Sequence, residues 1–469
     1  MTVERIGSVP ATDPQQRRRE QRGWYFYDWA AQPMFTSVTT AFGAAFVGAL
    51  AEEAAGQDVA RNGEQACESN ALTSCDVEFL GFSFSAGVAW PYLITAALLA
   101  QVLVLPIVGA INDRSFNRKR MLAVLAFIGA TSIALMVFAT GSNWKLAALL
   151  YLIGRVAEGT SIIVYYSFLT DVANADERDG VSSRGWGMGY LGGGLALALQ
   201  LVLVTQHDLF GLTQGEAVRG AFLMSGLWWA GFTLIPLARL KQRNTPPVDL
   251  ERKSVLTAGF VELGRTIRGA AAFPLTLWFL GAYLVYNDGV ATVISQSALY
   301  GRQELGFGQD TLIVTILVVQ FIAFVGAWLL GMLARSIGAK RTILTCLVGW
   351  IGVVVAAYFL QPGDALMFWL VAAGIGFVLG GTQALSRSLF SQLIPPGKDG
   401  QYFALYEMTE RGTAWLGTTM FAVIADVTGS FRPAIVALSA FFVIGFLLLV
   451  FLPVRKAIVA AGNTPPAQV

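Results

Sequence analysis

The sequence predicts an all-α membrane protein with twelve transmembrane helices arranged in two six-helix pseudo-repeats. Three observations predict this fold class. Hydrophobic residues make up 55% of the 469 residues and charged residues only 13%, against about a quarter charged in an ordinary soluble domain. Apolar runs of about 20 residues, long enough to cross a bilayer, recur along the chain. Landmarks in the first half of the chain also recur in the second half at a nearly constant offset.

Twelve apolar runs are the predicted transmembrane helices. A soluble fold of this size would have to expose one continuous apolar surface, which excludes that class. The same composition excludes intrinsic disorder, and a net charge of +2 gives no reason to expect nucleic-acid binding. The predicted spans are 26–50, 84–111, 121–140, 146–170, 185–205, 219–239, 273–299, 311–334, 342–361, 365–390, 402–426 and 432–453.

The distribution of Lys and Arg predicts the orientation of these spans. If the N-terminus is cytoplasmic, the cytoplasmic segments hold 24 of the 32 basic residues and the opposite side holds five. The positive-inside rule then places both termini in the cytoplasm, and we expect a multi-pass protein of the cell membrane. The 51–82 loop lies outside, where Cys67 and Cys75 form a disulfide or remain two free thiols.

The chain divides at its longest polar linker. We expect a cytoplasmic N-terminus at 1–25, a first half at 26–239, a linker at 240–272, a second half at 273–453 and a cytoplasmic tail at 454–469. Gly109 with Asp113 after the second span matches Gly331 with Arg335 after the eighth, at an offset of 222. The Asp-Gly pairs at 179–180 and 399–400 match at an offset of 220. Two agreeing landmarks indicate an internal duplication.

These features resemble the major facilitator superfamily, whose signature loop lies between spans two and three. In this sequence the loop reads Gly109…Asp113-Arg114…Arg118-Lys119, with Phe116 where a second glycine is usual. Further segments resemble the vacuolar-effluxer-like branch of that superfamily: Tyr27-Asp28-Trp29-Ala30, Ser183-Arg184-Gly185-Trp186, Gly192-Gly193-Gly194, Tyr286-Asn287-Asp288-Gly289-Val290, Gln383-Ala384-Leu385-Ser386-Arg387-Ser388 and Glu410-Arg411-Gly412. The resemblance covers nearly the whole chain. It implies a transporter, and small amino acids as the leading substrate.

Arg155 and Glu158 are the first candidates for substrate or proton binding. They lie in the fourth span at i,i+3 spacing and so share a helix face, which Tyr165 continues. Charge inside a membrane is costly, and this makes it a functional hypothesis by default. The alternative is a neutralised structural ion pair.

Asp288 is the second candidate, near the middle of the seventh span beside Asn287. A carboxyl group there could load and release a coupling proton, and a polar break in a helix is how many transporters form a site. The alternative is a kink at Asn-Asp-Gly, with Asp288 capping a broken segment. In the tenth span, Gln383 is deep enough to face substrate.

A second group of polar residues near the cytoplasmic side is expected to act in gating. The resemblance implies that Asp113 engages the start of the eleventh span. The basic residues around it, Arg118 to Arg120 above all, fit ordinary positive-inside anchors. Arg387 is expected to snorkel, and Asp28 to lie at the mouth of the first span, with interfacial solvation as its alternative. The gating candidates are Asp28, Asp113, Arg114, Arg387, Glu407, Glu410 and Arg411, the last three placed in the first turns of the eleventh span.

The remaining motifs give no candidate catalytic or cofactor site. Gly187-x-Gly189-x-x-Gly192 satisfies the dinucleotide fingerprint but lies inside a membrane span, where small residues let helices approach. A single His207 and three cysteines leave no metal site and no catalytic set. We therefore expect no cofactor and no enzyme.

Together the sequence predicts a monomeric secondary active transporter for a small solute, with a proton as coupling ion and the lipid bilayer as its surroundings. Arg155 and Asp288 would supply the cationic and anionic partners of a zwitterion. A drug or sugar permease of the same fold and a non-transporting sensor are the alternatives.

Overall fold

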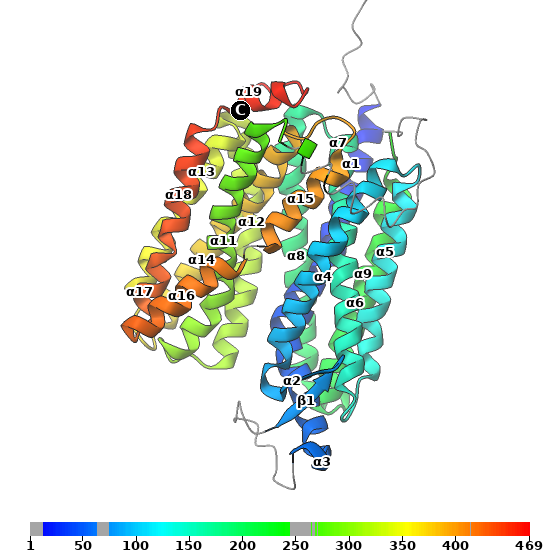
Figure 1. Ribbon diagram of the computed structural model, residues 1–469, viewed down its shortest axis with the longest axis vertical. Coiled ribbons are helices and arrows are strands. Elements are labelled where there is room, and N and C mark those ends of the chain that lie inside the picture. The colour runs from blue at the N-terminus through cyan, green and yellow to red at the C-terminus, as the bar shows by residue number, and fades with distance from the viewer. Residues whose placement is uncertain (1–12, 63–74, 244–263, 265–267, 270, 413) are drawn as a thin grey trace, which may run out of the picture.

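The computed structural model describes residues 13–62, 75–243, 264, 268–269, 271–412 and 414–469. Nearly all of them form helices (Figure 1). The first half contains α1 (Pro14–Pro33), η1 (Met34–Phe42), α2 (Gly43–Gln57), α3 (Val59–Asn62), β1 (Asp76–Phe79), β2 (Phe82–Ser85), η2 (Ala86–Val88), α4 (Ala89–Arg114), α5 (Arg118–Leu135), η3 (Met136–Phe138), α6 (Trp144–Ser167), α7 (Leu169–Val172), η4 (Ala175–Glu177), α8 (Arg178–Thr205), η5 (His207–Phe210) and α9 (Gln214–Arg239).

The second half contains α11 (Pro274–Gln303), α12 (Gln309–Ile337), α13 (Ala339–Tyr358), α14 (Ala365–Gln392), α15 (Asp399–Gly412), α16 (Ala414–Thr428), α17 (Phe431–Ala437), α18 (Ser439–Phe451) and α19 (Val454–Ala460). Figure 1 shows the two halves as two helix bundles side by side. We call the end of the bundles that carries α19 the tail end, and the end that carries β1 and β2 the hairpin end.

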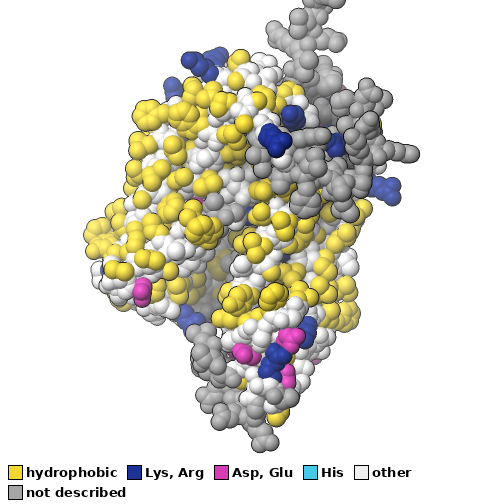
Figure 2. Space-filling view, in the orientation of Figure 1, with side chains coloured by type: hydrophobic (Ala, Val, Ile, Leu, Met, Phe, Trp, Pro, Cys, Tyr) yellow, Lys and Arg dark blue, Asp and Glu magenta, His cyan; other side chains and the backbone are white. Residues whose placement is uncertain are grey.

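Eleven helical stretches among the described residues are long and apolar enough to cross a membrane. They match eleven of the twelve predicted spans. The other, 402–426, corresponds to α15 and α16 on either side of residue 413, which lies outside the described residues. Figure 2 shows hydrophobic side chains spread over the sides of both bundles, as an all-α protein embedded in a bilayer requires.

Two predicted helix starts are wrong by seven residues or more. The first helix begins at Pro14 rather than residue 26, because Asp13 caps it and a proline fits its first turn. The fifth begins at Arg178 rather than 185. Both helices begin several residues before the apolar run that hydropathy detects. The predicted 51–82 loop is also partly ordered: β1 and β2 pair through a two-residue turn at Leu80 and Gly81, which both have positive φ.

The pseudo-repeat is visible in how the two halves pack on each other. α4 packs against α15, and α12 against α8. A Cβ on Gly109 of α4 would lie 2.5 Å from the carbonyl oxygen of Gly400, and one on Gly331 of α12 would lie 2.4 Å from the Ser183 side chain. The duplicated glycines therefore permit two equivalent close approaches between the halves.

The C-terminal tail lies across the tail end of both halves. Asn463 Nδ2 donates to the carbonyl oxygens of Gln392, at 2.8 Å, and Ile394, at 2.7 Å. The amide of Ala467 donates to Asp176 Oδ1 of the first half at 2.7 Å. Residues 463–467 thus connect the end of α14 to η4.

Candidate functional site

The fourth predicted span, α6, carries an ion pair at the middle of the membrane. Arg155 and Glu158 form a salt bridge on one helix face, as their spacing predicts, and the Arg155 guanidinium lies 5.9 Å from the centre of the Phe35 ring. Because Glu158 already neutralises Arg155, a ligand carboxylate at this point would compete with Glu158 for the guanidinium.

A glutamine that sequence reasoning missed connects this pair to the other half. Gln101, fully buried in the middle of α4, donates to the carbonyl oxygen of Arg155 and accepts from Arg411 Nη1 at 2.6 Å. Arg411 is held in turn by Glu407 at 2.6 Å. A lone glutamine inside an apolar span is the signal in the sequence that marks this position.

The structure places three charged residues at the end of a helix and not at its predicted start: Glu407, Glu410 and Arg411. They occupy the last two turns of α15, which begins at Asp399, and so cannot stabilise the helix dipole as first-turn residues would. Glu410 Oε2 accepts from the Tyr283 hydroxyl at 2.9 Å. These side chains therefore join the charges in the middle of the membrane rather than the tail end.

The seventh span, α11, runs without a break through Asn287, Asp288 and Gly289, so Asp288 does not cap a broken segment as the alternative required. The Asp288 carboxyl instead accepts from the backbone amide of Gly417, in the first turns of α16, at 2.8 Å. Asn287 Oδ1 accepts from Gln383 Nε2 at 2.8 Å. Asn287 is thus joined to Gln383 on α14, whereas the neighbouring Asp288 is joined to α16.

Asp28, Tyr165 and Arg387 form a third group, at the interface between the halves. The Arg387 side chain is fully buried and lies 3.1 Å from Asp28, which also accepts from the Tyr165 hydroxyl at 2.7 Å. Trp24, Tyr166 and Trp186 place their rings about the guanidinium. Arg387 therefore does not snorkel, and Asp28 is not solvated at the membrane interface. Tyr165 belongs to this group and not to the Glu158 face.

Asp113 contacts the start of α15, as the resemblance implied. Its two carboxylate oxygens accept from the amides of Gly400, at 2.6 Å, and Gln401, at 2.9 Å. The first amides of a helix have no partner within the helix, and a carboxylate there also favours the helix dipole. The neighbouring Arg114 is half-buried.

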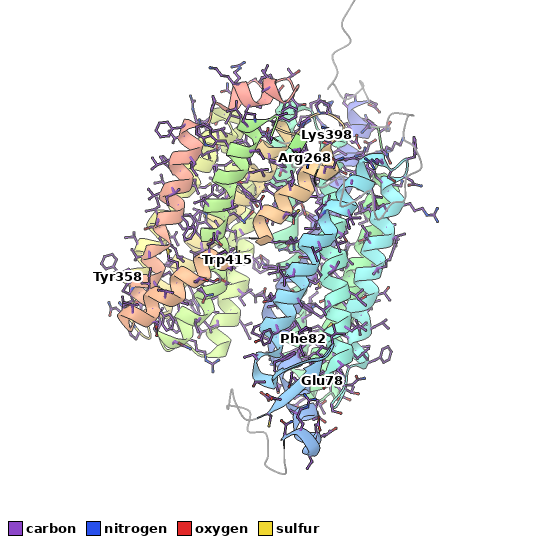
Figure 3. The ribbon with its side chains drawn as sticks, in the orientation of Figure 1. Glu78, Phe82, Arg268, Tyr358, Lys398 and Trp415 are labelled. Atoms are coloured by element: carbon purple, nitrogen blue, oxygen red, sulfur yellow. The ribbon has the colours of Figure 1, made fainter. Side chains whose placement is uncertain are left out.

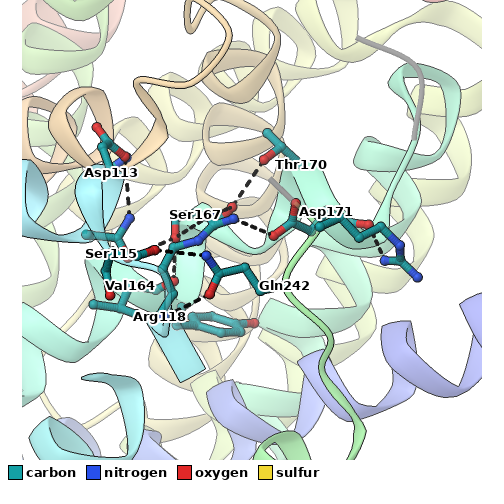
Figure 4. A network of polar contacts seen from close by, with 12 residues as sticks. Asp113, Ser115, Arg118, Val164, Ser167, Thr170, Asp171 and Gln242 are labelled. Atoms are coloured by element: carbon teal, nitrogen blue, oxygen red, sulfur yellow. Dashed lines mark hydrogen bonds and ion pairs between the residues drawn. The ribbon is translucent and has the colours of Figure 1, made fainter. Parts of the chain in front are cut away.

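Arg118 is buried in an ion pair rather than exposed at the tail end. Its guanidinium lies 2.8 Å from Asp171, with both side chains buried, and Figure 4 shows the two groups facing each other below Ser167. Its backbone amide donates to Gln242 Oε1 at 2.8 Å. The pair ties the start of α5 to α7, so it is structural.

Replacing Arg118 with glutamine should lower the free energy of unfolding by about 3 kcal/mol, because it removes the positive charge that faces the buried Asp171 carboxylate. Arg120 is exposed two residues further along the same helix. Arg120→Gln should change the free energy of unfolding by less than about 0.5 kcal/mol. Chemical unfolding of the two purified variants measures the difference, and equal stabilities would contradict the structural assignment.

The hairpin end holds a pocket of about 440 Å³. Its charged lining includes Asp58, Arg61, Glu78 and Lys145, and Figure 3 places Glu78 and Phe82 at this end of the first half. Cys75 is buried beside the hairpin and is disulfide-bonded. Cys67, its predicted partner, lies outside the described residues.

The hydrogen bonds that join the two halves among the described residues run from mid-membrane to the tail end. At mid-membrane, Gln320 donates to Thr36 at 2.7 Å, and Arg411 donates to Gln101. Nearer the tail end, Arg178 donates to the carbonyl of Ser391 and Ser388 to Asp179. Figure 2 shows the surface hollowed between the halves towards the hairpin end. The structure is thus closed at the tail end.

Comparison with solved structures identifies this fold as that of major facilitator transporters. The human organic anion transporter MFSD10 (TETRAN) is similar with a TM-score of 0.64 and 14% identity, over 93% of this chain and all of that chain. The Escherichia coli fucose:proton symporter FucP gives a TM-score of 0.61 and 13% identity, over 92% of this chain and 98% of that chain. Both similarities are evidence for the fold alone.

The family model described as "Vacuole effluxer Atg22 like" matches residues 16–462, so the chain belongs to this family. A Bacillus subtilis protein described as "Uncharacterized MFS-type transporter YxiO" is 29% identical over 93% of this chain and 95% of its own length. Autophagy-related protein 22-1 of Phaeosphaeria nodorum is 26% identical over 93% of this chain and 90% of its own length. The chain is therefore a multi-pass membrane transporter of the major facilitator type.

Proposed function

We propose that this protein is a monomeric secondary active transporter of the cell membrane that moves small amino acids by alternating access, coupled to protons. The observation that carries the proposal is the one-sided closure of the fold. The two halves are joined at the tail end and part towards the hairpin end, as one of the two states of a rocking pair of repeats would be.

The orientation of the proposed transporter has both termini in the cytoplasm. The distribution of 24 basic residues against five supports this orientation. The tail end is then the cytoplasmic end, and Asp28, Asp113, Arg114 and Arg387 act as parts of a closed cytoplasmic gate. The hollow between the halves at the hairpin end then opens to the outside of the cell.

The buried charges at mid-membrane supply what an amino acid and a proton require. Arg155 offers a guanidinium to a carboxylate, and Asp288 offers a carboxylate to an amine. Glu158 is placed to couple a proton to the motion, because it pairs with Arg155, whose carbonyl is linked through Gln101 to Arg411 of the other half. A change in the charge of Glu158 also alters its electrostatic interaction with Arg411, which donates to Gln101 across the interface between the halves.

Uptake into proteoliposomes tests the proposal. We expect labelled small amino acids to be exchanged, and a pH gradient to drive their accumulation at least tenfold above that in its absence. Glu158→Gln should abolish the gradient-driven part, while Glu53→Gln, at an exposed position near the hairpin end, should leave it unchanged. Transport of sugars or cationic dyes without amino acids would favour the permease alternative, and transport of none of these solutes would favour a sensor.

A further inference from the structure

Asp288 is a buried acid with one carboxylate oxygen that accepts no hydrogen bond from the described residues. The side chain is 2% exposed. Oδ2 is fixed by the Gly417 amide, whereas Oδ1 has no hydrogen-bond partner in the described part of the chain. The carboxyl group is therefore held in one orientation with one oxygen free to accept.

Asp288 also lacks a cationic partner in the described part of the chain. Asp28, Glu407 and Asp171 each lie within 3.1 Å of a guanidinium, those of Arg387, Arg411 and Arg118. No lysine or arginine among the described residues lies close enough to Asp288 to balance its negative charge. Since an ionised carboxylate without a compensating charge is costly to bury, the chemistry that complements Asp288 is a positive charge.

The neighbouring free groups are oxygens as well. Thr292 Oγ1 lies one turn along the same face of α11, is fully buried, and has no partner in the described part of the chain. Gln383 Oε1 is likewise buried without a partner, while its Nε2 is bonded to Asn287 beside Asp288. These oxygens can accept hydrogen bonds from a primary ammonium group or coordinate a hard cation.

The charge of this group limits the ligand to a monovalent cation. One carboxylate balances one positive charge, whereas divalent sites such as those for calcium usually combine several carboxylates. The absence of sulfur or imidazole among these three residues also disfavours transition metals. The remaining class is sodium ion or a primary ammonium group.

Gly417 allows α16 to pack closely against Asp288 and Thr292 of α11. A Cβ at this position would lie 2.2 Å from Thr292 Oγ1, so glycine allows the α16 backbone to reach the carboxylate. The site is thus built between α11 and α16, at the middle of the membrane, and moves with the second half of the chain.

We propose that Asp288, in its ionised form, and Thr292 form a subsite for a monovalent cation. The occupant is sodium or the ammonium group of the transported solute. The proton-carrying role then falls to Glu158 alone. The role of the subsite in transport rests on the proposed function, but its occupancy does not.

Thermal unfolding of the purified protein in lipid nanodiscs tests the subsite. At fixed pH and ionic strength, sodium chloride is compared with potassium chloride and N-methyl-D-glucamine chloride. In the last salt, L-alanine is compared with propionate, which lacks the amine. Saturable stabilisation by sodium would identify the inorganic ion, and stabilisation by L-alanine but not by propionate would identify the ammonium group.

Asp288→Asn and Thr292→Val should each weaken the apparent affinity at least tenfold. Asp426→Asn, at an exposed position on α16, is the matched control and should bind as the wild type does. The unfolding temperature in N-methyl-D-glucamine chloride shows whether each variant is folded.

Unchanged binding by Asp288→Asn would overturn the proposal. So would a wild-type protein that responds to pH alone, because the ligand would then be a proton. Binding without any uptake into proteoliposomes would refute the proposed transport function and leave the subsite intact.

Discussion

Arg387→Met should lower the free energy of unfolding by about 3–5 kcal/mol, the usual cost of leaving one partner of a buried ion pair without the other. Arg387 is fully buried and lies 3.1 Å from Asp28. It also donates to the Ser182 hydroxyl at 2.9 Å and to the Ser182 carbonyl at 2.8 Å. Methionine fills much of the same space. The loss of stability therefore comes mainly from Asp28 and Ser182, which lose the guanidinium that they contact.

A double-variant cycle separates the ion pair from the rest of this interface. Asp28→Asn combined with Arg387→Met should recover part of the loss, because the remaining charge is removed. Arg341→Met, at an exposed position of α13, is the control and should cost less than about 0.5 kcal/mol. The measurement is chemical unfolding in detergent. A double variant no more stable than Arg387→Met would show that the pairing of charge is not what matters.

Gly109→Ala should open the closed tail end. The added Cβ would lie 2.5 Å from the carbonyl oxygen of Gly400 and 2.9 Å from Ala404 Cβ, so α4 and α15 must separate. Separation weakens the two hydrogen bonds of Asp113 to the start of α15. We expect the closed state to be destabilised by about 1–3 kcal/mol, as other overpacked contacts are.

The labelling rate of a cysteine at position 391 measures this opening. Ser391 is buried in the closed tail end, and the native Cys346 is buried as well. In a Ser391→Cys background, Gly109→Ala should raise the rate of modification by a water-soluble maleimide at least tenfold. Gly231→Ala is the matched control, because a Cβ there meets open space. An equal rate in both variants would mean that the contact between α4 and α15 does not hold this end closed.

The helices could be predicted from the sequence because each buries an apolar run, but their ends could not. α1 extends twelve residues before its predicted start, since Glu20 is held by Arg243 at 2.6 Å and Arg17 by Glu177 at 2.8 Å. Partners more than 150 residues apart leave no trace in a hydropathy profile. The fifth span is the other case, because α8 begins with the polar segment 178–184, which a hydropathy profile does not detect.

Individual site residues could be predicted from the scarcity of charge in the spans, whereas their grouping could not. Spacing along a helix correctly paired Arg155 with Glu158. It also placed Tyr165 with Glu158, although the Tyr165 hydroxyl bonds Asp28 on α1. Periodicity relates residues of one helix only, and the contacts of Arg387, Gln101 and Asp288 all lie between helices distant in the sequence.

The path of the C-terminal tail sets a length limit on motion. Asn463 is fastened to the end of α14 and Ala467 to Asp176 of the other half, with only four peptide units between them. A fully extended chain covers at most about 14 Å over that distance. As long as both attachments hold, the two halves cannot separate further than this at the tail end. The tail therefore acts as a tether, fastened by the side chains of Asn463 and Asp176, whose length determines the widest opening while both bonds hold.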